Sequence, residues 1–176
     1  MKHFQPAPRV PTGRALMLGR LAMTGTVLAV VVIDEATKAV ALGRGVVHVN
    51  QGVSFGLLAE RPAVAALLST VVLMVVATVA WKWARTAPQF LAFGLILGGA
   101  VGNGLNRLGL GRSAGVVDWI TMPGYPAAFN VADIAIRLGV VMIVGQLAWS
   151  LLHAQASKSR GDLQDPNGNA RGSMTG

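Results

Sequence analysis

The sequence is poor in charged residues and contains no cysteine. Of its 176 residues, 12% are charged and 53% are hydrophobic, whereas an ordinary soluble domain carries roughly 25% charged residues. The missing cysteines exclude a disulfide scaffold, a four-cysteine zinc site and a thiol nucleophile. A solvated globular surface is hard to build with 7 acidic residues. The composition therefore predicts one membrane-embedded unit of several helices.

Basic residues outnumber acidic residues by 15 to 7, which gives a formal net charge of +8. The cations cluster beside apolar segments, where anionic lipid headgroups are simpler partners than nucleic acid. We therefore expect membrane lipids as partners and no nucleic acid.

Four apolar segments are long enough to cross a hydrocarbon core, which takes roughly 20 helical residues. They cover residues 21–42, 62–83, 89–105 and 127–152. We expect a single membrane domain over residues 16–153. The flanks, residues 1–15 and 154–176, are rich in Pro, Gly, Ser, Asn and charge, and we expect them to be disordered tails. The first segment is interpreted as a span and not as a cleaved signal peptide, because acidic and basic residues interrupt it and three more spans follow.

Lysine and arginine near the span ends predict the orientation of the chain. The side that holds both termini carries Lys2, Arg9, Arg14, Arg20, Lys82, Arg85, Lys158, Arg160 and Arg171, and the other side carries Arg44, Arg61, Arg107 and Arg112. This excess places both termini in the cytoplasm and the connections at 43–61 and 106–126 outside.

Ionisable groups inside hydrocarbon cost several kcal/mol, so they indicate functional sites. With the predicted orientation, polar residues from three spans and one loop fall at the same depth near the outer leaflet: Asp34, Glu35, Lys38, Asn103, Asp118, Asn130 and Asp133. Structural roles remain open for some of them. Asp34 and Lys38 are four residues apart and can neutralise each other, and Asn103 and Asn130 can join helices by hydrogen bonds.

Two further patterns predict structure. Gly94, Gly98 and Gly102 recur every four residues, which favours close helix packing and places the third span at the centre of the bundle. Residues 45–56 alternate and carry β-branched residues, so they predict a short strand pair or a platform on the outer surface. In that segment His48 is interpreted as an exposed strand residue.

No zinc or serine chemistry is expected. The sequence has no HExxH spacing, and Ser54, Ser69 and Ser113 have no paired Lys or His in a recognisable arrangement. Asp118 and Asp133 are better candidates, because two carboxyls that meet in a low-dielectric pocket share a proton. The ionised carboxyl can then take a proton from water while the protonated one polarises a carbonyl.

Two other functions stay open on spacing alone. One is an ion or proton relay through Asp34, Asp133 and Arg137. A relay should continue across the bilayer, whereas the cytoplasmic halves of the spans hold almost no ionisable group apart from Arg20. The other is a non-enzymatic membrane partner or scaffold.

Five short motifs occur in one order along the chain. They are DEATK at 34–38, NQGVSFG at 50–56, GGAVGN at 98–103, VVDWI at 116–120 and FNVAD at 129–133. This series resembles the bacterial lipoprotein signal peptidases (signal peptidase II), in order and spacing, over roughly residues 21–152.

The resemblance implies an all-α membrane protein, a four-transmembrane-helix bundle with a small extracytoplasmic β-cradle. It implies a multi-pass protein of the bacterial cytoplasmic membrane, with its active site on the extracytoplasmic side. The family cleaves diacylglyceryl-modified prolipoproteins before the lipidated cysteine, as an aspartic endopeptidase without metal or other cofactor, and a monomer is expected. The catalytic aspartates would be Asp118 and Asp133. Substrate-binding or supporting residues would be Asp34, Lys38, Asn50, Asn103, Arg107 and Asn130.

The chain departs from the family pattern near the candidate site: Trp119 replaces the usual Phe, the loop between Asp118 and Asp133 is a few residues shorter, and two further departures change charge. Asn106 stands where the family motif GNxxDR has Asp, which would weaken an ion pair with Arg107. Arg137 is unexpected one turn below Asp133. If Arg137 faces Asp133, it favours Asp133 as the base and Asp118 as the acid; if it does not, the reverse assignment stays open. These departures also leave open a divergent paralogue with reduced or altered activity.

Overall fold

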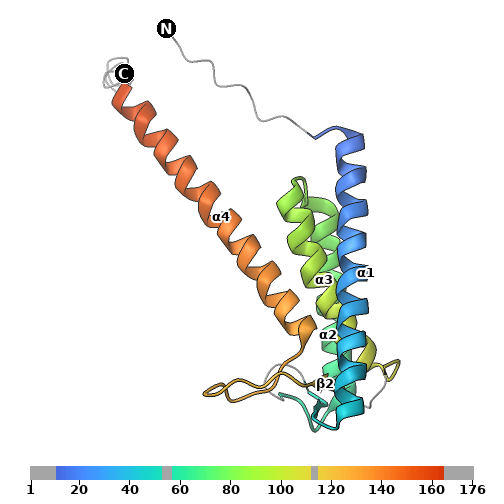
Figure 1. The fold of residues 1–176 in the computed structure, drawn as a ribbon. Helices are drawn as coiled ribbons and strands as arrows, with labels where there is room; N and C mark the ends of the chain where they lie inside the picture. Colours follow the sequence, from blue (N-terminus) through green and yellow to red (C-terminus); the bar gives the residue numbers. More distant parts are fainter. Residues whose placement is uncertain (1–10, 53–56, 112–114, 165–176) are drawn as a thin grey trace. The chain divides into compact units, whose positions relative to one another are not determined.

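The computed structural model describes residues 11–52, 57–111 and 115–164, with side chains to residue 157. The chain divides into two units, Met1–Val140 and Val141–Gly176, which are considered separately. The elements follow in the order α1, β1, α2, α3, β2 and α4 (Figure 1). All residues of the candidate site lie in the first unit. The outer parts of the predicted tails, and residues 53–56 of the second motif, lie outside the described residues.

Helix α1 (Gly13–Arg44) is longer than the predicted span at 21–42. Thr12 caps its first turn, because the hydroxyl accepts a hydrogen bond from the Ala15 backbone N–H at 3.3 Å. Gly45 ends the helix with φ 68°, a left-handed conformation that glycine adopts without strain. The predicted tail at 1–15 is therefore too long at its C-terminal end, because α1 starts directly after Thr12, the capping residue that follows Pro11.

Helices α2 and α3 lie close to the predicted spans. Helix α2 (Pro62–Trp83) has the predicted limits and begins with proline, whose missing N–H costs nothing at that position. Helix α3 (Ala87–Arg107) extends the predicted span at both ends. The Gln89 side chain accepts a hydrogen bond from the Thr86 backbone N–H at 3.2 Å and so helps to start α3.

Helix α4 (Val131–Gln164) differs most from the prediction. Its predicted start at residue 127 is wrong, because residues before Val131 are held in extended backbone by a bridge between Ile120 and Phe129. Its predicted end at 152 is also wrong, and so is the disordered tail as far as residue 164. The segment after residue 153 contains good helix formers and no proline before Pro166.

The glycines of α3 are where the bundle packs most closely. A Cβ at Gly94 would lie 2.7 Å from Cβ of Thr26, and one at Gly98 would lie 2.7 Å from Cβ of Val30. On another face of α3, a Cβ at Gly99 would collide with the backbone oxygen of Ala132. The predicted glycine packing face is confirmed, and it brings both α1 and the start of α4 against α3.

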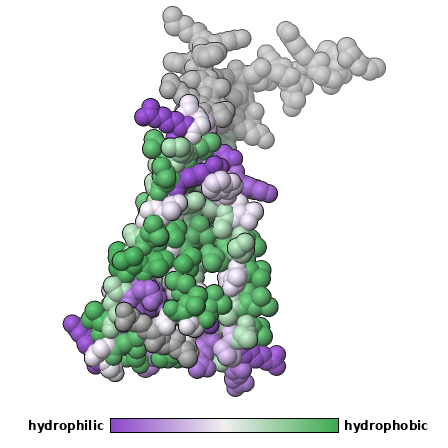
Figure 2. Space-filling model, turned by 90° about the vertical axis from the view of Figure 1, so that its right-hand side faces the viewer, coloured by the Kyte–Doolittle hydropathy of each residue, from purple (hydrophilic) through white to green (hydrophobic). Residues whose placement is uncertain are grey.

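Most large apolar side chains point outward. The described helices expose many leucine and valine side chains, and Figure 2 shows them as a broad apolar surface. The buried apolar cluster is small and includes Met23, Phe90 and Leu97. Among the described residues, four helices are long and apolar enough to cross a membrane. An apolar exterior around a small core is what a lipid-facing bundle requires.

The small sheet joins two connections that are distant in sequence. Strand β1 (His48–Asn50) pairs antiparallel with β2 (Val116–Asp118), with His48 opposite Asp118. The strand predicted within residues 45–56 is confirmed, but its partner in the described structure comes from the connection between α3 and α4. Strand β2, which ends at Asp118, contacts α1 and α3 (Figure 1), and Asp118 lies within hydrogen-bond distance of Asn130, just before α4.

Candidate active site

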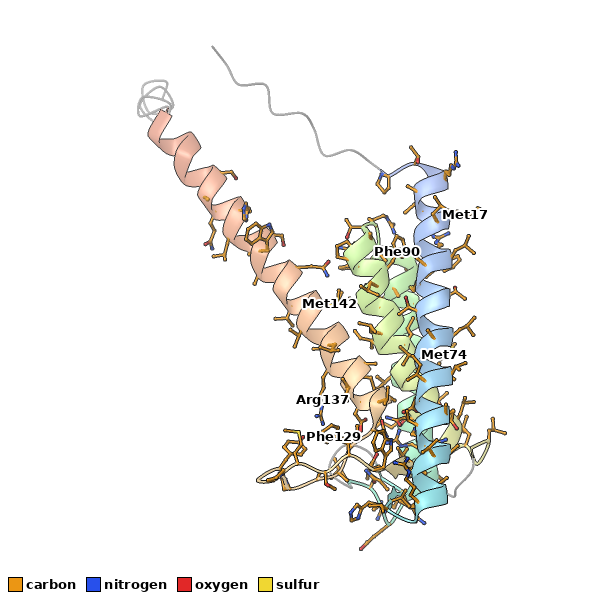
Figure 3. The ribbon with its side chains drawn as sticks, in the orientation of Figure 1. Met17, Met74, Phe90, Phe129, Arg137 and Met142 are labelled. Carbon is orange, nitrogen blue, oxygen red and sulfur yellow. The ribbon has the colours of Figure 1, made fainter. Side chains whose placement is uncertain are left out.

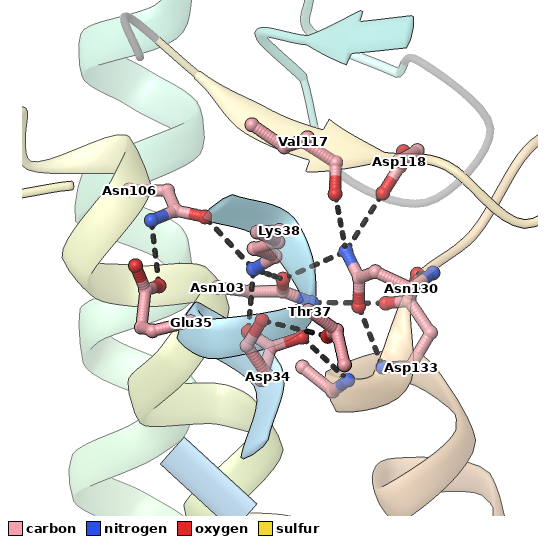
Figure 4. Close-up of polar contacts among 11 residues, drawn as sticks. Asp34, Glu35, Thr37, Lys38, Asn103, Asn106, Val117, Asp118, Asn130 and Asp133 are labelled. Atoms are coloured by element: carbon pink, nitrogen blue, oxygen red, sulfur yellow. Dashed lines mark hydrogen bonds and ion pairs between the residues drawn. The ribbon is translucent and has the colours of Figure 1, made fainter. Parts of the chain in front are cut away.

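Lys38 lies at the centre of a polar cluster and is 1% exposed. Its ammonium forms an ion pair with Asp34 Oδ2 at 2.6 Å, as expected from their spacing. It also donates hydrogen bonds to Asn103 Oδ1 at 3.0 Å and Asn106 Oδ1 at 2.8 Å (Figure 4). An ammonium has three N–H groups, so each has a partner. This saturation explains how a cation is accommodated inside the bundle.

Asp34 links α1 to α4. Its Oδ1 accepts a hydrogen bond from the Ala132 backbone N–H at 2.9 Å. The N–H groups in the first turn of a helix have no partner within the helix and form its positive end. A carboxylate of α1 therefore caps α4 and fixes the first turn of α4 in place.

Asp133 is oriented by a reciprocal cap at the start of α4. The Asp133 N–H donates to Asn130 Oδ1 at 2.9 Å, and the Asn130 N–H donates to Asp133 Oδ2 at 3.2 Å. The other carboxylate oxygen, Oδ1, accepts from Asn103 Nδ2 at 2.9 Å. Both oxygens of Asp133 thus accept hydrogen bonds from N–H donors, which fix the orientation of the carboxylate.

Asp118 ends β2 and is 5% exposed. Its Oδ1 accepts from Asn130 Nδ2 at 2.7 Å, whereas its Oδ2 has a longer contact of 3.5 Å with Asn50 Nδ2. Burial, together with the charge of Asp133, raises the pKa of Asp118 to about 6, against the hydrogen bonds from Asn50 and Asn130 and the charge of Lys38. Asp118 therefore carries a proton more readily than an ordinary aspartate.

Asn130 connects the two aspartates. It is fully buried, its side-chain amide donates to Asp118, and its backbone N–H donates to Asp133. The same Nδ2 also lies 3.1 Å from Asn103 Oδ1, which in addition accepts a hydrogen bond from the Lys38 ammonium. The aspartates, which are distant in sequence, are thus brought to opposite sides of one asparagine (Figure 4).

Both aspartates line a cavity of about 450 Å³. Its polar wall includes Asn103 and Arg107, and its apolar wall includes Leu68, Val72 and Ile136. A second cavity of about 570 Å³ follows β1 and shares Asn50 and Asp118 with the first. Asp118 therefore borders both a cavity between helices and a cavity along the edge of the sheet.

Arg107 holds the turn after β1. Its Nε and Nη2 donate to the Gly52 carbonyl oxygen at 3.0 and 2.9 Å. Asn50 Oδ1 accepts from the Gly52 N–H at 2.9 Å, which closes the same turn. Asn50 and Arg107 both line the cavity that Asp118 and Asp133 line, and Arg107 there donates to the backbone that follows β1.

Asn106 does not face Arg107, contrary to the expectation of a weakened ion pair between the two. Its Oδ1 accepts from Lys38, and its Nδ2 donates to Glu35 Oε1 at 2.8 Å. The negative charge missing at position 106 is therefore present at Glu35, one hydrogen bond away. The sequence marks Glu35 as an unusual acid in a span, but its part in the network depends on a contact between two helices, for which the sequence carries no local signal.

Arg137 does not form an ion pair with Asp133 in the described structure. Its Nη2 donates to the Tyr125 hydroxyl at 3.1 Å, and its guanidinium lies 5.3 Å from the Phe129 ring centre. Figure 3 shows Arg137 extending from α4 toward Phe129. The condition under which Arg137 was expected to make Asp133 the base is therefore not met.

The other candidate groups stay apart from this network. His48 is exposed on β1, and Ser69 donates to the Ala65 backbone oxygen at 2.8 Å within α2. Ser54 and Ser113 lie outside the described residues. Among the described residues, no three His, Cys, Asp or Glu side chains gather as metal ligands would.

Comparison with known protein families gives one consistent match. The model of the family described as signal peptidase (SPase) II matches residues 26–149. A lipoprotein signal peptidase of Pelodictyon phaeoclathratiforme is 35% identical over 146 residues, covering 67% of this chain and 85% of the relative. A lipoprotein signal peptidase of Pseudomonas putida is 34% identical over 158 residues, covering 76% of this chain and 91% of the relative.

Solved structures give the same fold. A bacterial membrane enzyme solved in meso at 2.3 Å resolution aligns with a TM-score of 0.65 and 22% identity, over 81% of this chain and 93% of that chain. A second, solved at 1.9 Å, aligns with a TM-score of 0.61 and 23% identity. The predicted four-helix membrane bundle with a small sheet is confirmed by this likeness and by the helices described above.

Proposed function

Since the chain belongs to the signal peptidase II family, we propose that Asp118 and Asp133 are the catalytic pair with which it removes signal peptides from prolipoproteins. The observation that carries this proposal is the position of Asn130, which donates one hydrogen bond to each aspartate. Both aspartates also line one cavity. This is the arrangement that aspartic hydrolysis needs, because two neighbouring carboxyls divide the acid and base roles.

Asp133 is the base and Asp118 is the acid in this mechanism. Asp133 accepts hydrogen bonds on both oxygens, from Asn103 Nδ2 and the Asn130 backbone N–H, which hold its carboxylate in place beside the cavity. Asp118 has a raised pKa, and its Oδ2 keeps only a 3.5 Å contact with Asn50. Asp133 as the base and Asp118 as the acid is the assignment that an Arg137–Asp133 contact would have favoured. Here it is supported instead by the surroundings of the two aspartates.

Hydrolysis then proceeds without a covalent intermediate. Asp133 takes a proton from a water whose oxygen attacks the scissile carbonyl carbon, while Asp118 gives its proton to the carbonyl oxygen. The tetrahedral diol collapses as Asp133 passes its proton to the peptide nitrogen and Asp118 recovers a proton from one hydroxyl. The C–N bond breaks, and the pair returns to its starting protonation.

The remaining polar residues position this pair. Asn103 and Asn130 orient the carboxylates directly. Lys38 holds Asn103, and Asp34 fixes the first turn of α4. Arg107 secures the turn after β1, beside which the substrate backbone would extend next to Asn50.

The substrate is a prolipoprotein with a diacylglyceryl-modified cysteine, cleaved just before that cysteine. Its acyl chains would remain in hydrocarbon at the apolar wall of the 450 Å³ cavity. The positive-inside pattern supports cytoplasmic termini and a site that opens on the extracytoplasmic side. A single chain contributes every group of the mechanism, so a monomer suffices. The relay alternative has no support in the family comparison.

The test is cleavage of a diacylated precursor peptide by the purified protein in detergent. Cleavage should continue in EDTA and be lost in both Asp118→Asn and Asp133→Asn, whereas Glu60→Gln, a change at an exposed loop acid, should leave it intact. Cleavage that persists in either aspartate variant would remove that residue from the pair. Loss of cleavage in EDTA, with recovery on adding Zn²⁺, would refute the metal-independent mechanism.

A further inference from the structure

Arg137 is a charged side chain that the proposed mechanism does not use. It lies on α4 inside a segment apolar enough to cross a membrane, and it is exposed. Its neighbours on the helix surface include Ile134, Leu138 and Val140, which are exposed apolar residues. A cation in such a place is costly unless polar groups reach it. The groups that surround its guanidinium therefore indicate what it does.

The guanidinium is held beside the cavity that both aspartates line. Nη2 donates to the Tyr125 hydroxyl at 3.1 Å, and the guanidinium carbon lies 5.6 Å from the Tyr125 ring centre and 5.3 Å from that of Phe129. The two rings meet edge to face with centres 5.9 Å apart, so they form a rigid support for the cation. Arg137 and Tyr125 line the same cavity as Asp118 and Asp133.

Most of the hydrogen-bonding capacity of Arg137 is unused in the described structure. A guanidinium has five N–H donors, and the bond to Tyr125 accounts for one of them. No carboxylate of the described residues forms an ion pair with it. Arg137 is therefore a fixed group with several donors that face a cavity in which a lipid-bearing peptide is cleaved.

We propose that Arg137, held by Tyr125, binds an ester carbonyl of the diacylglyceryl group on the substrate cysteine and so selects ester-linked lipid. This inference rests on the proposed function. Asp133 and Arg137 are one helical turn apart, about 6 Å along the axis. In the substrate, about seven bonds separate the cysteine Cα from the nearer ester carbonyl oxygen, a reach of roughly 8 Å. When the scissile bond lies at the aspartates, an ester carbonyl therefore reaches the level of Arg137.

The chemistry of the group fits this role. An ester carbonyl accepts hydrogen bonds but carries no charge, so it satisfies N–H donors without a counter-ion. It also lies at the boundary between the polar headgroups and the hydrocarbon, where a lipid-exposed arginine is best accommodated. Since the ester is present before and after the chemical step, Arg137 contributes equally to ground-state and transition-state binding, and its loss raises KM with little change in kcat.

The test compares two substrate peptides that differ only in the lipid linkage, diacyl ester and dialkyl ether. The ether has no carbonyl to accept a hydrogen bond. The unmodified enzyme should cleave the ester substrate with a KM about tenfold lower, the effect of one hydrogen bond to a charged donor. Arg137→Gln should raise KM for the ester about tenfold, leave the ether unchanged, and so abolish the preference. Arg44→Gln, which changes another exposed arginine, should retain it.

Three kinetic results would overturn the proposal. The first is an equal KM for ester and ether in the unmodified enzyme, and the second is an unchanged ester preference in Arg137→Gln. A KM rise for both substrates in Arg137→Gln would also refute ester recognition, since it would indicate that Arg137 supports the Tyr125 loop or binds bulk lipid headgroups.

A binding measurement separates this proposal from the proposed function. Affinity of the two uncleaved lipopeptides for Asp118→Asn, measured by fluorescence anisotropy in detergent, does not depend on catalysis. An ester preference in binding that disappears in Asp118→Asn/Arg137→Gln supports recognition by Arg137 even if the catalytic assignment fails. Equal affinity of Asp118→Asn for both lipopeptides refutes ester recognition while the catalytic assignment stands.

Discussion

The contact between α1 and α3 is built in two different ways along its length. In one part, Gly98 allows α3 to approach Val30, and the contact depends on shape. In the other part, the Lys38 ammonium from α1 is bonded to Asn103 and Asn106 from α3, and the contact depends on hydrogen bonds. A packing contact loses stability gradually when it is altered, whereas a buried polar network fails when one member is removed. The α1–α3 contact thus has a packing part around Gly98 and Val30, which holds the helices together, and a polar part around Lys38, Asn103 and Asn106, which shapes the candidate site.

The largest expected effect is from Lys38→Met, which removes the cation from the polar part. Asp34 is then buried without its ion-pair partner, which costs about 3–5 kcal/mol of stability. In addition, Asn103 Oδ1 loses the hydrogen bond that it accepts from Lys38. Misplacement of a catalytic group by about 1 Å costs roughly 100-fold in rate, so we expect at least that loss of cleavage. Cleavage rate and thermal unfolding in detergent measure both effects. Lys82→Met, at an exposed position, is the control, and unchanged turnover in Lys38→Met would contradict this account.

Gly98→Ala alters the packing part and should reduce stability without altering the chemistry. The new Cβ would lie 2.7 Å from Cβ of Val30, an overpacking that costs about 1–3 kcal/mol. The midpoint of unfolding should fall, whereas KM and the pH profile of the folded enzyme should not change. Gly25→Ala provides the matched control on α1, because a Cβ there meets no atom within 4 Å. A shifted pH profile in Gly98→Ala would show that the two parts are not separate.

Asn106→Asp tests whether Glu35 supplies the negative charge that position 106 lacks. An aspartate at this position would place a second carboxylate against Glu35 Oε1, which now receives the Asn106 amide at 2.8 Å. We expect a loss of about 1–2 kcal/mol from like-charge contact, measured by thermal unfolding. The double variant Glu35→Gln/Asn106→Asp should recover most of that loss, and Glu35→Gln alone should be nearly neutral. Equal stability of the single variant Asn106→Asp and the double variant would show that Glu35 does not balance position 106.

The smallest effect is the dependence of stability on pH through Asp118. Its pKa rises on folding from 3.8 to about 6, so its protonated form favours the fold below pH 4 and that contribution is lost as the pH rises through 6. Asp118→Asn cannot ionise and keeps its stability. The difference in melting temperature, variant minus parent, should therefore grow from pH 4 to pH 7 in detergent. Glu60→Gln should show no such trend, and a difference that shrinks with pH would contradict the raised pKa.

The sequence predicted those parts of the fold that depend on local properties. The limits predicted for α2 match the structure, because its apolar segment begins at a proline, which favours the first turn of a helix, and ends at Trp83. The start of α4 was placed too early, because Phe129 belongs to an apolar segment but is held by a bridge to Ile120. The partner of β1 was not predicted, since strand pairing between distant connections leaves no local pattern.

The sequence predicted which residues belong to the candidate site better than it predicted the hydrogen bonds between them. Polar residues at one membrane depth and the five motifs indicated Asp118 and Asp133, and the structure brings them to one cavity. The bond from Asn106 to Glu35 depends on how α1 and α3 rotate against each other, which hydropathy does not encode. The bond from Arg137 to Tyr125 depends on the path of a loop, for the same reason.

The hydrogen bond from the Ala132 backbone to Asp34 has a consequence for biosynthesis. Asp34 is made early in translation and Ala132 late, so a ribosome-bound chain that ends before α4 lacks the group that this carboxylate caps. The aspartate at 133 and its asparagine partner also arrive with that last helix. On the proposed mechanism, cleavage therefore requires that the final segment has been inserted and its first turn capped.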